Sequence, residues 1–183
     1  MSKKVLLDAK EIDIILHRLA CQLIENHGDF SDTVLIGIQP RGVSVLNRLQ
    51  TILQNENKLT NLSIGQLDIT FFRDDFRRRD EPLEANKTSI DTILENKRVV
   101  LIDDVLFTGR SIRAALTAID SYGWPSDIEL LVLIDRRFSR NLPIQPTYLG
   151  KQVDAVNNEK VSVAWHEKKS KNAIYLIQKT IKK

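Results

Sequence analysis

The sequence predicts an α/β fold with a mainly parallel central sheet flanked by helices. Short apolar runs of strand length, among them Thr33–Ile38, Arg98–Asp103 and Ile128–Asp135, indicate buried strands. Segments with helical spacing of apolar residues stand between these runs, and this alternation is typical of parallel sheets. A length of 183 residues suits one domain, so we assign residues 1–183 to a single domain.

Composition and charge are those of a globular protein. The chain is 42% hydrophobic and 28% charged, with a formal net charge of +3, which is compatible with anionic ligands but does not require them. The single cysteine, Cys21, excludes an intrachain disulfide and fits a reducing compartment. We see no secretory leader and no apolar run of about 18 residues, so we expect a cytoplasmic protein without a membrane partner.

Two helices and one strand are predicted in the first third of the chain. Asp8–Gly28 has apolar residues on one face, and Asp8 with Glu11 forms a possible capping box at its start. The strand Thr33–Ile38 follows, and residues 39–53 then read as a turn that opens a second amphipathic helix.

The middle of the chain changes character. Gln66–Phe72 alternates apolar and polar residues, which predicts a strand with Leu67, Ile69 and Phe71 on one face. Residues 73–97 are strongly charged with few apolar residues, so we expect a long flexible loop there. In a compact domain such a loop is usually a lid or is disordered.

The last part adds a helix, a strand and a tail. Ser111–Tyr122 predicts a helix whose inward face holds Ile112, Ala115, Leu116 and Ile119. Val161–Trp165 alternates and predicts a half-exposed strand. The basic segment 167–183 reads as a solvated lysine tail.

The chemistry of the chain concentrates after the strand Arg98–Asp103. Asp103 and Asp104 stand where we expect that strand to end, and ligands of open α/β sheets bind at the carboxyl ends of strands. Thr108 and Ser111 offer hydroxyls, while Gly109 permits a close backbone approach. The N–H groups at the start of the following helix suit a monophosphate.

The two carboxylates cannot hold that phosphate themselves because like charges repel. They suit the hydroxyls of an attached sugar, since a charge-assisted hydrogen bond contributes about 1.5–3 kcal/mol, or a nearby magnesium ion. A sugar phosphate therefore fits the segment. Two alternatives stay open at this point: a solvated aspartate pair that caps a helix, and an acidic phosphoacceptor or metal pocket of the kind found in receiver domains.

The segment Val99–Gly109, VVLIDDVLFTG, closely resembles the phosphoribosyl-pyrophosphate (PRPP) loop of type I phosphoribosyltransferases. Further segments resemble, in order and spacing, the PyrR family of pyrimidine operon regulators and uracil phosphoribosyltransferases. These are GIQPRG (Gly37–Gly42), GQLDITFFRDD (Gly65–Asp75), DEPL (Asp80–Leu83), LIDR (Leu133–Arg136) and LPIQPTYLGK (Leu142–Lys151). The resemblance covers roughly residues 5–165 and implies the type I phosphoribosyltransferase fold, with a flexible loop at about 73–97 and a small hood.

The resemblance also implies function. Members of the family convert uracil and PRPP to UMP and pyrophosphate, with Mg²⁺ present as the PRPP complex. In several bacteria they bind the leader of pyrimidine operon mRNA in response to uridine nucleotides such as UMP and UTP. The family commonly forms dimers and higher assemblies, so we expect a homo-oligomer. The alternatives are a non-catalytic RNA-binding attenuator and a phosphoribosyltransferase for another base.

Roles for individual residues follow from the same resemblance. Asp103 and Asp104 would bind the ribose hydroxyls, and with Arg41 they form the expected catalytic set. Pro40, Arg41 and Gly42 match the pyrophosphate loop. Arg73 lies in the loop that closes over PRPP, and Arg136 matches the segment near the base. The 5′-phosphate would be held by Val105, Leu106, Phe107, Thr108, Gly109, Arg110 and Ser111.

Phe107 bears on the choice of base, and the cluster Arg77–Arg79 bears on pyrophosphate binding. Phe107 stands where enzymes for 6-oxopurines place an acid, which argues against purines as substrates. The cluster Arg77–Arg79 either helps to neutralise pyrophosphate or is simply solvated.

Other features are less informative. Arg137–Pro143 departs from the family pattern Gly-His-Arg-Glu-Leu-Pro, so we expect the base-side contacts to differ in detail. His17, His27 and His166 are scattered, which predicts surface positions and no covalent catalysis.

Overall fold

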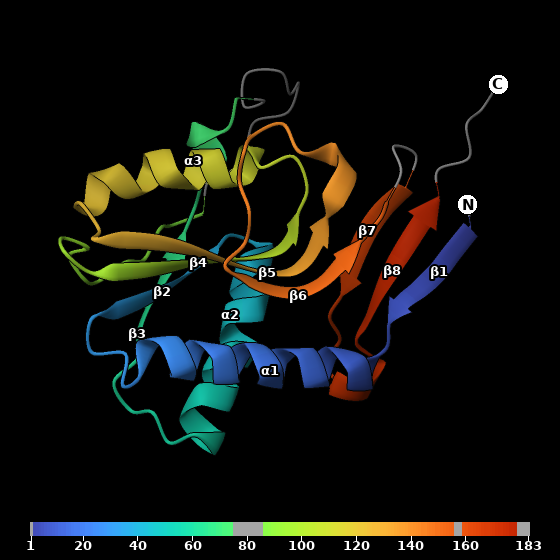
Figure 1. Cartoon of the computed structure of the whole chain (residues 1–183), viewed down its shortest axis with the longest axis horizontal. Coiled ribbons are helices and arrows are strands. Elements are labelled where there is room, and N and C mark those ends of the chain that lie inside the picture. The colour runs from blue at the N-terminus through green and yellow to red at the C-terminus, as the bar shows by residue number, and fades with distance from the viewer. Residues whose placement is uncertain (1, 75–85, 156–158, 179–183) are drawn as a thin grey trace.

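The computed structural model describes residues 2–74, 86–155 and 159–178. Its helices are α1 (Ala9–His27), α2 (Arg41–Thr51) and α3 (Arg110–Ile119), and its strands are β1 (Ser2–Leu7), β2 (Thr33–Ile38), β3 (Ser63–Leu67), β4 (Arg98–Leu106), β5 (Asp127–Arg136), β6 (Tyr148–Val153), β7 (Glu159–Ala164) and β8 (Ala173–Gln178). In the described residues, five strands form a parallel sheet in the order β3-β2-β4-β5-β6. A three-stranded antiparallel sheet, β1-β8-β7, stands beside it (Figure 1).

The central sheet is covered on both faces, as the apolar runs predict. Figure 1 shows α1 and α2 on one side of the sheet and α3 on the other. Alternate side chains of β4 point to opposite faces of the sheet. Val100 and Ile102 pack in the core with α1 and α2, whereas Val99 and Leu101 pack with α3. Each fully buried side chain of this kind contributes about 1.5–3 kcal/mol relative to exposure.

The capping box of α1 is confirmed. The Asp8 carboxylate accepts from the Glu11 N–H at 2.8 Å, and the Glu11 carboxylate accepts from the Asp8 N–H at 2.9 Å. At the other end, Gly28 takes a φ of 56° and donates to the Ile24 carbonyl. These caps satisfy backbone groups that a helix end otherwise leaves unpaired.

The strand predicted at Gln66–Phe72 is wrong over most of its length. β3 ends at Leu67, and the chain turns into a short 3₁₀ helix at Thr70–Phe72. The cause is Asp68, whose carboxylate accepts from the Thr70 N–H and the Asn86 N–H, both at 2.6 Å. An aspartate that bonds the backbone two residues on forms an Asx turn and ends a strand. Phe71, predicted to share a face with Leu67 and Ile69, is 61% exposed, whereas those two are buried.

The antiparallel sheet corrects the expectation of a solvated tail. Ala173–Gln178 forms β8, which pairs with β1 on one edge and β7 on the other. Residues 179–183 lie outside the described part of the chain. One helix residue also departs from prediction, since Leu116 is 37% exposed whereas Ile112, Ala115 and Ile119 are buried. Of the helices in the described residues, none is both long enough and apolar enough to cross a membrane.

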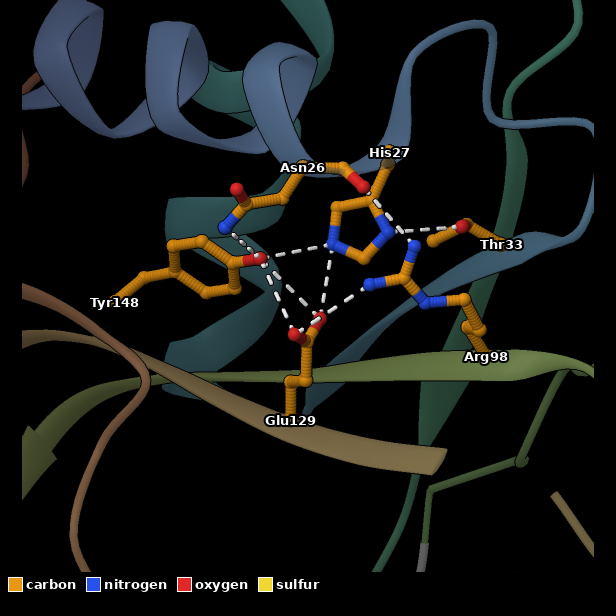
Figure 2. Close-up of polar contacts among 6 residues, drawn as sticks. All are labelled: Asn26, His27, Thr33, Arg98, Glu129 and Tyr148. Atoms are coloured by element: carbon orange, nitrogen blue, oxygen red, sulfur yellow. Dashed lines mark hydrogen bonds and ion pairs between the residues drawn. The ribbon is translucent and has the colours of Figure 1, made fainter. Parts of the chain in front are cut away.

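His27 is buried, so its predicted surface position is wrong. It is 8% exposed and lies in a polar network at the amino-terminal edge of the parallel sheet (Figure 2). Its Nδ1 lies 3.0 Å from the Thr33 hydroxyl, and its Nε2 lies 2.9 Å from the Glu129 carboxylate and 3.0 Å from the Tyr148 hydroxyl. Arg98 reaches the same carboxylate at 3.6 Å. The network therefore ties the end of α1 to the first residues of the strands.

This network predicts a pH dependence of stability. Burial lowers the pKa of His27 below its ordinary value of 6.5, an effect that outweighs the attraction of Glu129. Below pH 6.5 the unfolded chain thus binds a proton that the folded chain resists, and the contribution of His27 to stability is lost as the pH falls. We expect His27→Gln to lower the free energy of unfolding by about 1–3 kcal/mol at pH 7.5, and the difference from wild type to narrow towards pH 5.

Thermal melts of both proteins between pH 5 and 8 measure this difference. His166→Gln, at an exposed position, is the control and should track wild type throughout. A His27→Gln deficit that is constant over the whole range would contradict the prediction.

Candidate active site

The carboxyl ends of β2, β4 and β5 surround a cavity of about 540 Å³. An adjoining cavity of about 270 Å³, bounded by the segment between β4 and α3, shares Asp103, Phe107 and Ser111 with it. Together the two are lined by all the predicted site residues except Gly42: Pro40, Arg41, Arg73, Asp103, Asp104, Val105, Leu106, Phe107, Thr108, Gly109, Arg110, Ser111 and Arg136. A separate cavity of about 600 Å³, between α1 and α2, is lined by none of them. The structure thus gathers the sequence-predicted residues at one edge of the sheet.

The aspartate pair lies inside β4 rather than at its end. The strand continues past the two residues and pairs Val105 with Ile134 and Leu106 with Asp135. Asp104 is 4% exposed, and its carboxylate lies 3.9 Å from Arg41 Nη1. Helix α3 has Gly109 at its N-cap and no side-chain capping bond. The alternative of a solvated pair that caps a helix is therefore excluded.

Burial sets the electrostatics of the pair. Removal from water, reinforced by the negative charge of Asp104, raises the pKa of Asp103 to about 8. Burial also raises the pKa of Asp104, although Arg41 opposes the rise. One backbone contact supports the charged form, since the Asp104 N–H donates to Asp103 Oδ1 at 2.8 Å. At neutral pH the pair thus holds a proton that a ligand preferring two carboxylates would displace.

Gly42 belongs to the site although it lines neither cavity. It follows Arg41 at the start of α2, and a Cβ on it would lie 2.1 Å from the Ile102 carbonyl oxygen. Because only glycine fits at that separation, α2 begins against the backbone of β4 one residue before Asp103. This close contact places the Arg41 side chain, which is 57% exposed, beside the aspartates.

The segment between β4 and α3 has the geometry of an anion-binding loop. Gly109 takes a φ of 89°, α3 begins at the next residue, and the first residues of the helix line the smaller cavity. The Arg73 guanidinium donates to the Ser111 hydroxyl at 3.3 Å. The Arg110 guanidinium is held by Asp74, at 3.0 and 2.8 Å. The cluster Arg77–Arg79 lies outside the described residues.

Phe107 and Arg136 line one wall of the larger cavity. The Arg136 guanidinium stacks on its ring, 4.0 Å from the centroid, and donates to the Glu159 carbonyl at 2.8 Å. Arg136 is 5% exposed, and its Nε is buried without a hydrogen-bond partner among the described residues. Arg136 lines the cavity, so its guanidinium is placed to donate to a ligand oxygen there.

Sequence reasoning missed Arg140. Its guanidinium forms an ion pair with Asp135 and donates to the Phe107 carbonyl at 2.7 Å. The neighbouring Arg137 instead pairs with Asp154 at the surface. The only sequence signal was the departure of residues 137–143 from the family pattern, which does not show which arginine turns inward.

Comparisons with known proteins agree on one family. A family model described as a phosphoribosyl transferase domain matches residues 2–168. The chain is 40% identical over 177 residues to a bifunctional protein PyrR of Clostridium novyi, covering 97% of this chain and 98% of the relative. It is 46% identical over 158 residues to a protein of the same name from Gloeothece citriformis, covering 86% and 88%.

Solved structures share the fold at lower identity. A hypoxanthine-guanine-xanthine phosphoribosyltransferase superposes with a TM-score of 0.66 at 17% identity and covers 96% of this chain and 94% of its own. A hypoxanthine phosphoribosyltransferase of Staphylococcus aureus gives a TM-score of 0.64 at 24% identity, covering 84% and 80%. At such identities the similarity concerns the fold alone.

The raised pKa of Asp103 predicts that the site costs stability at alkaline pH. Between the ordinary aspartate pKa of 3.8 and about 8, the folded chain holds a proton that the unfolded chain has lost, so stability falls as the pH rises through this window. Asp103→Asn removes the cost. We expect the variant to melt above wild type at pH 8.5 by roughly 3–9 °C, equivalent to about 1–3 kcal/mol, and the gap to close towards pH 5.

Asp91→Asn, at an exposed loop position, is the charge-matched control and should leave the pH profile of wild type unchanged. An Asp103→Asn variant that melts below wild type at pH 8.5 would show that the carboxylate stabilises the fold.

Proposed function

The chain belongs to the phosphoribosyl transferase domain family, and on this premise we propose that it is a uracil phosphoribosyltransferase. Relatives named bifunctional protein PyrR match it along nearly its whole length. Family and fold confirm the sequence prediction of a phosphoribosyltransferase. The proposed reaction converts uracil and PRPP to UMP and pyrophosphate.

One observation carries the proposal: the aspartate pair and the anion-binding loop line adjoining cavities. Asp103 lines both cavities, so it stands between the loop at Thr108–Ser111 and the site at Arg41. A phosphoribosyl group carries a phosphate and two hydroxyls, which match the loop and the carboxylates of the two adjoining cavities. Its 5′-phosphate would sit at the helix N-terminus, and its 2′- and 3′-hydroxyls would donate to the carboxylates.

The same geometry supplies a mechanism. Arg41 lines the larger cavity but not the smaller one at the phosphate loop, and there its guanidinium would bind the pyrophosphate and stabilise the charge that develops as it leaves. The carboxylates, once deprotonated, would stabilise positive charge that spreads over the ribose ring. Uracil N1 bonds to C1 of ribose as the C1–O bond to pyrophosphate breaks, and the proton of N1 passes to the departing pyrophosphate or to water. The protein contributes mainly position and charge, which are the large terms in such displacements.

Magnesium enters with the substrate. In the described residues no group of three or more carboxylate, histidine or cysteine side chains is placed to hold a metal ion. Mg²⁺ commonly binds one or two carboxylates together with substrate phosphates, and Asp103–Asp104 beside a pyrophosphate would provide such a set. The ion would neutralise the departing pyrophosphate.

Phe107 and Arg136 favour a pyrimidine with exocyclic oxygens. Phe107 gives an apolar surface where a purine-specific enzyme of this type would carry an acid. The Arg136 guanidinium on the same wall would donate to a carbonyl oxygen of the base. Uracil offers two such oxygens.

The test is direct. Protein incubated with PRPP, Mg²⁺ and one labelled base from uracil, hypoxanthine, guanine, adenine and orotate should form nucleotide from uracil with the highest kcat/KM. Asp104→Asn should lower kcat/KM for PRPP by about 100-fold while the fold persists, and Asp91→Asn should match wild type. Absence of UMP at saturating PRPP would reject uracil as the substrate, and preference for another base would reassign it.

A second function is favoured by the relatives, which are named bifunctional. The resemblance to pyrimidine operon regulators makes leader RNA the partner and UMP or UTP the signal. In a gel shift, the leader should bind more tightly, by about tenfold or 1.4 kcal/mol, when UMP is present than when it is absent. An RNA of equal length and shuffled sequence is the control. Equal binding of both RNAs, or indifference to UMP, would leave the enzyme as the sole function.

A further inference from the structure

We propose that Arg140 is a positioning residue for the phosphate loop, and that residues 140–144, the buttress segment, hold Phe107–Gly109 in the conformation that receives the 5′-phosphate. The inference rests on the proposed function for the identity of the ligand. It assigns a role to a segment that lines neither cavity.

Arg140 makes two contacts with one guanidinium. Nη1 donates to the Phe107 carbonyl at 2.7 Å, and Nη2 forms the ion pair with Asp135. The ion pair is largely buried, since the side chains of Arg140 and Asp135 are 17% and 7% exposed. A planar guanidinium presents its donors in a fixed fork, so the ion pair with β5 also fixes the position of the Phe107 carbonyl.

A second carbonyl of the loop is held from the same side. The Asn141 N–H donates to the Thr108 carbonyl at 3.0 Å. In a planar trans peptide, the N–H points opposite to the C=O. With the carbonyls of Phe107 and Thr108 turned to the buttress segment, the N–H groups of Thr108 and Gly109 point away from it, towards the side where the loop lines the cavities. Successive N–H groups on one side form an anion-binding nest.

Apolar contacts complete the buttress. The position that a Cβ on Gly109 would occupy lies 3.4 Å from Ile144 Cδ1 and 3.5 Å from Leu142 Cβ. These side chains therefore cover the back of the loop at the residue whose positive φ starts α3. The segment supports the loop by backbone hydrogen bonds, an ion pair and packing at once.

Charge gives Arg140 a further effect. Asp135 is 5% exposed and pairs in register with Leu106, directly before the loop. An uncompensated carboxylate there would repel a phosphate, and the guanidinium cancels it. Phe107 is then held by two arginines: Arg136 stacks on its ring, and Arg140 binds its carbonyl. The surface proposed for the base and the loop proposed for the phosphate thus share one residue, Phe107, which is held at both its ring and its carbonyl.

Arg140→Lys is the informative variant. An ammonium can keep the ion pair with Asp135, so the fold should survive with a melting temperature close to that of wild type. It cannot reproduce the fork to the Phe107 carbonyl, so we expect Kd and KM for PRPP to rise about tenfold or more, because small misplacements of binding groups are costly. The KM for uracil should change less. Arg137→Lys is the matched control, since Arg137 lies three residues before Arg140, outside the buttress segment, and pairs with Asp154 at the surface.

The double variant Asp135→Asn with Arg140→Gln removes both charges without leaving one buried alone. It should show the same loss of PRPP affinity at moderate salt, which separates positioning of the loop from cancellation of the Asp135 charge. Loss of affinity in Arg140→Lys but full affinity in the double variant would overturn the backbone role. Wild-type PRPP affinity in Arg140→Lys, or an equal loss in Arg137→Lys, would overturn the proposal.

Calorimetric titration with PRPP and Mg²⁺ keeps this test separate from the proposed function. If wild type binds PRPP but forms no UMP, the choice of uracil fails while the Arg140 comparison still stands. If wild type does not bind PRPP at all, both fail together.

Discussion

The structure depends on a strand that must be apolar on both faces and yet carry two carboxylates near its carboxyl end. β4 lies in the middle of the parallel sheet, and Val99–Ile102 are all buried. Asp103 and Asp104 follow immediately and remain within the strand. Their burial raises their pKa values, so the fold disfavours the ionised form of both carboxyl groups. Such a cost persists where a ligand, rather than the protein, supplies the compensating groups.

The two edges of the sheet treat buried polar groups in opposite ways. At the amino edge, His27 and Glu129 find partners within the protein, and the network joins α1 to the strands (Figure 2). At the carboxyl edge, Arg41 approaches the aspartates only to 3.9 Å, and Arg136 keeps a buried Nε without a partner in the described residues. The first edge is built for stability and the second for a ligand, since unsatisfied buried groups are tolerated mainly at functional sites.

The sequence predicted which residues come together around the two cavities better than it predicted the periphery. The motif Val99–Gly109 is local, so its residues fix one another through strand, turn and helix start. β1 and β8 escaped prediction because β1 pairs with a strand from the opposite end of the chain. The strand at Gln66–Phe72 failed because one side chain, Asp68, offers the backbone an alternative to the ladder. Arg140 failed for the same reason as β1, because its contacts become visible only when β5 and the loop lie side by side.

Phe107 shows what the sequence and the structure each contribute. A phenylalanine there removes a carboxylate from the base site, and this much can be read from sequence. The structure adds that the same residue carries a carbonyl held by Arg140 and a ring held by Arg136. On the proposed function, the ring that would form the base surface and the carbonyl at the phosphate loop therefore belong to one residue. On the proposed function, we therefore expect a substitution of Phe107 to change PRPP binding together with base preference wherever it displaces the peptide that Arg140 holds.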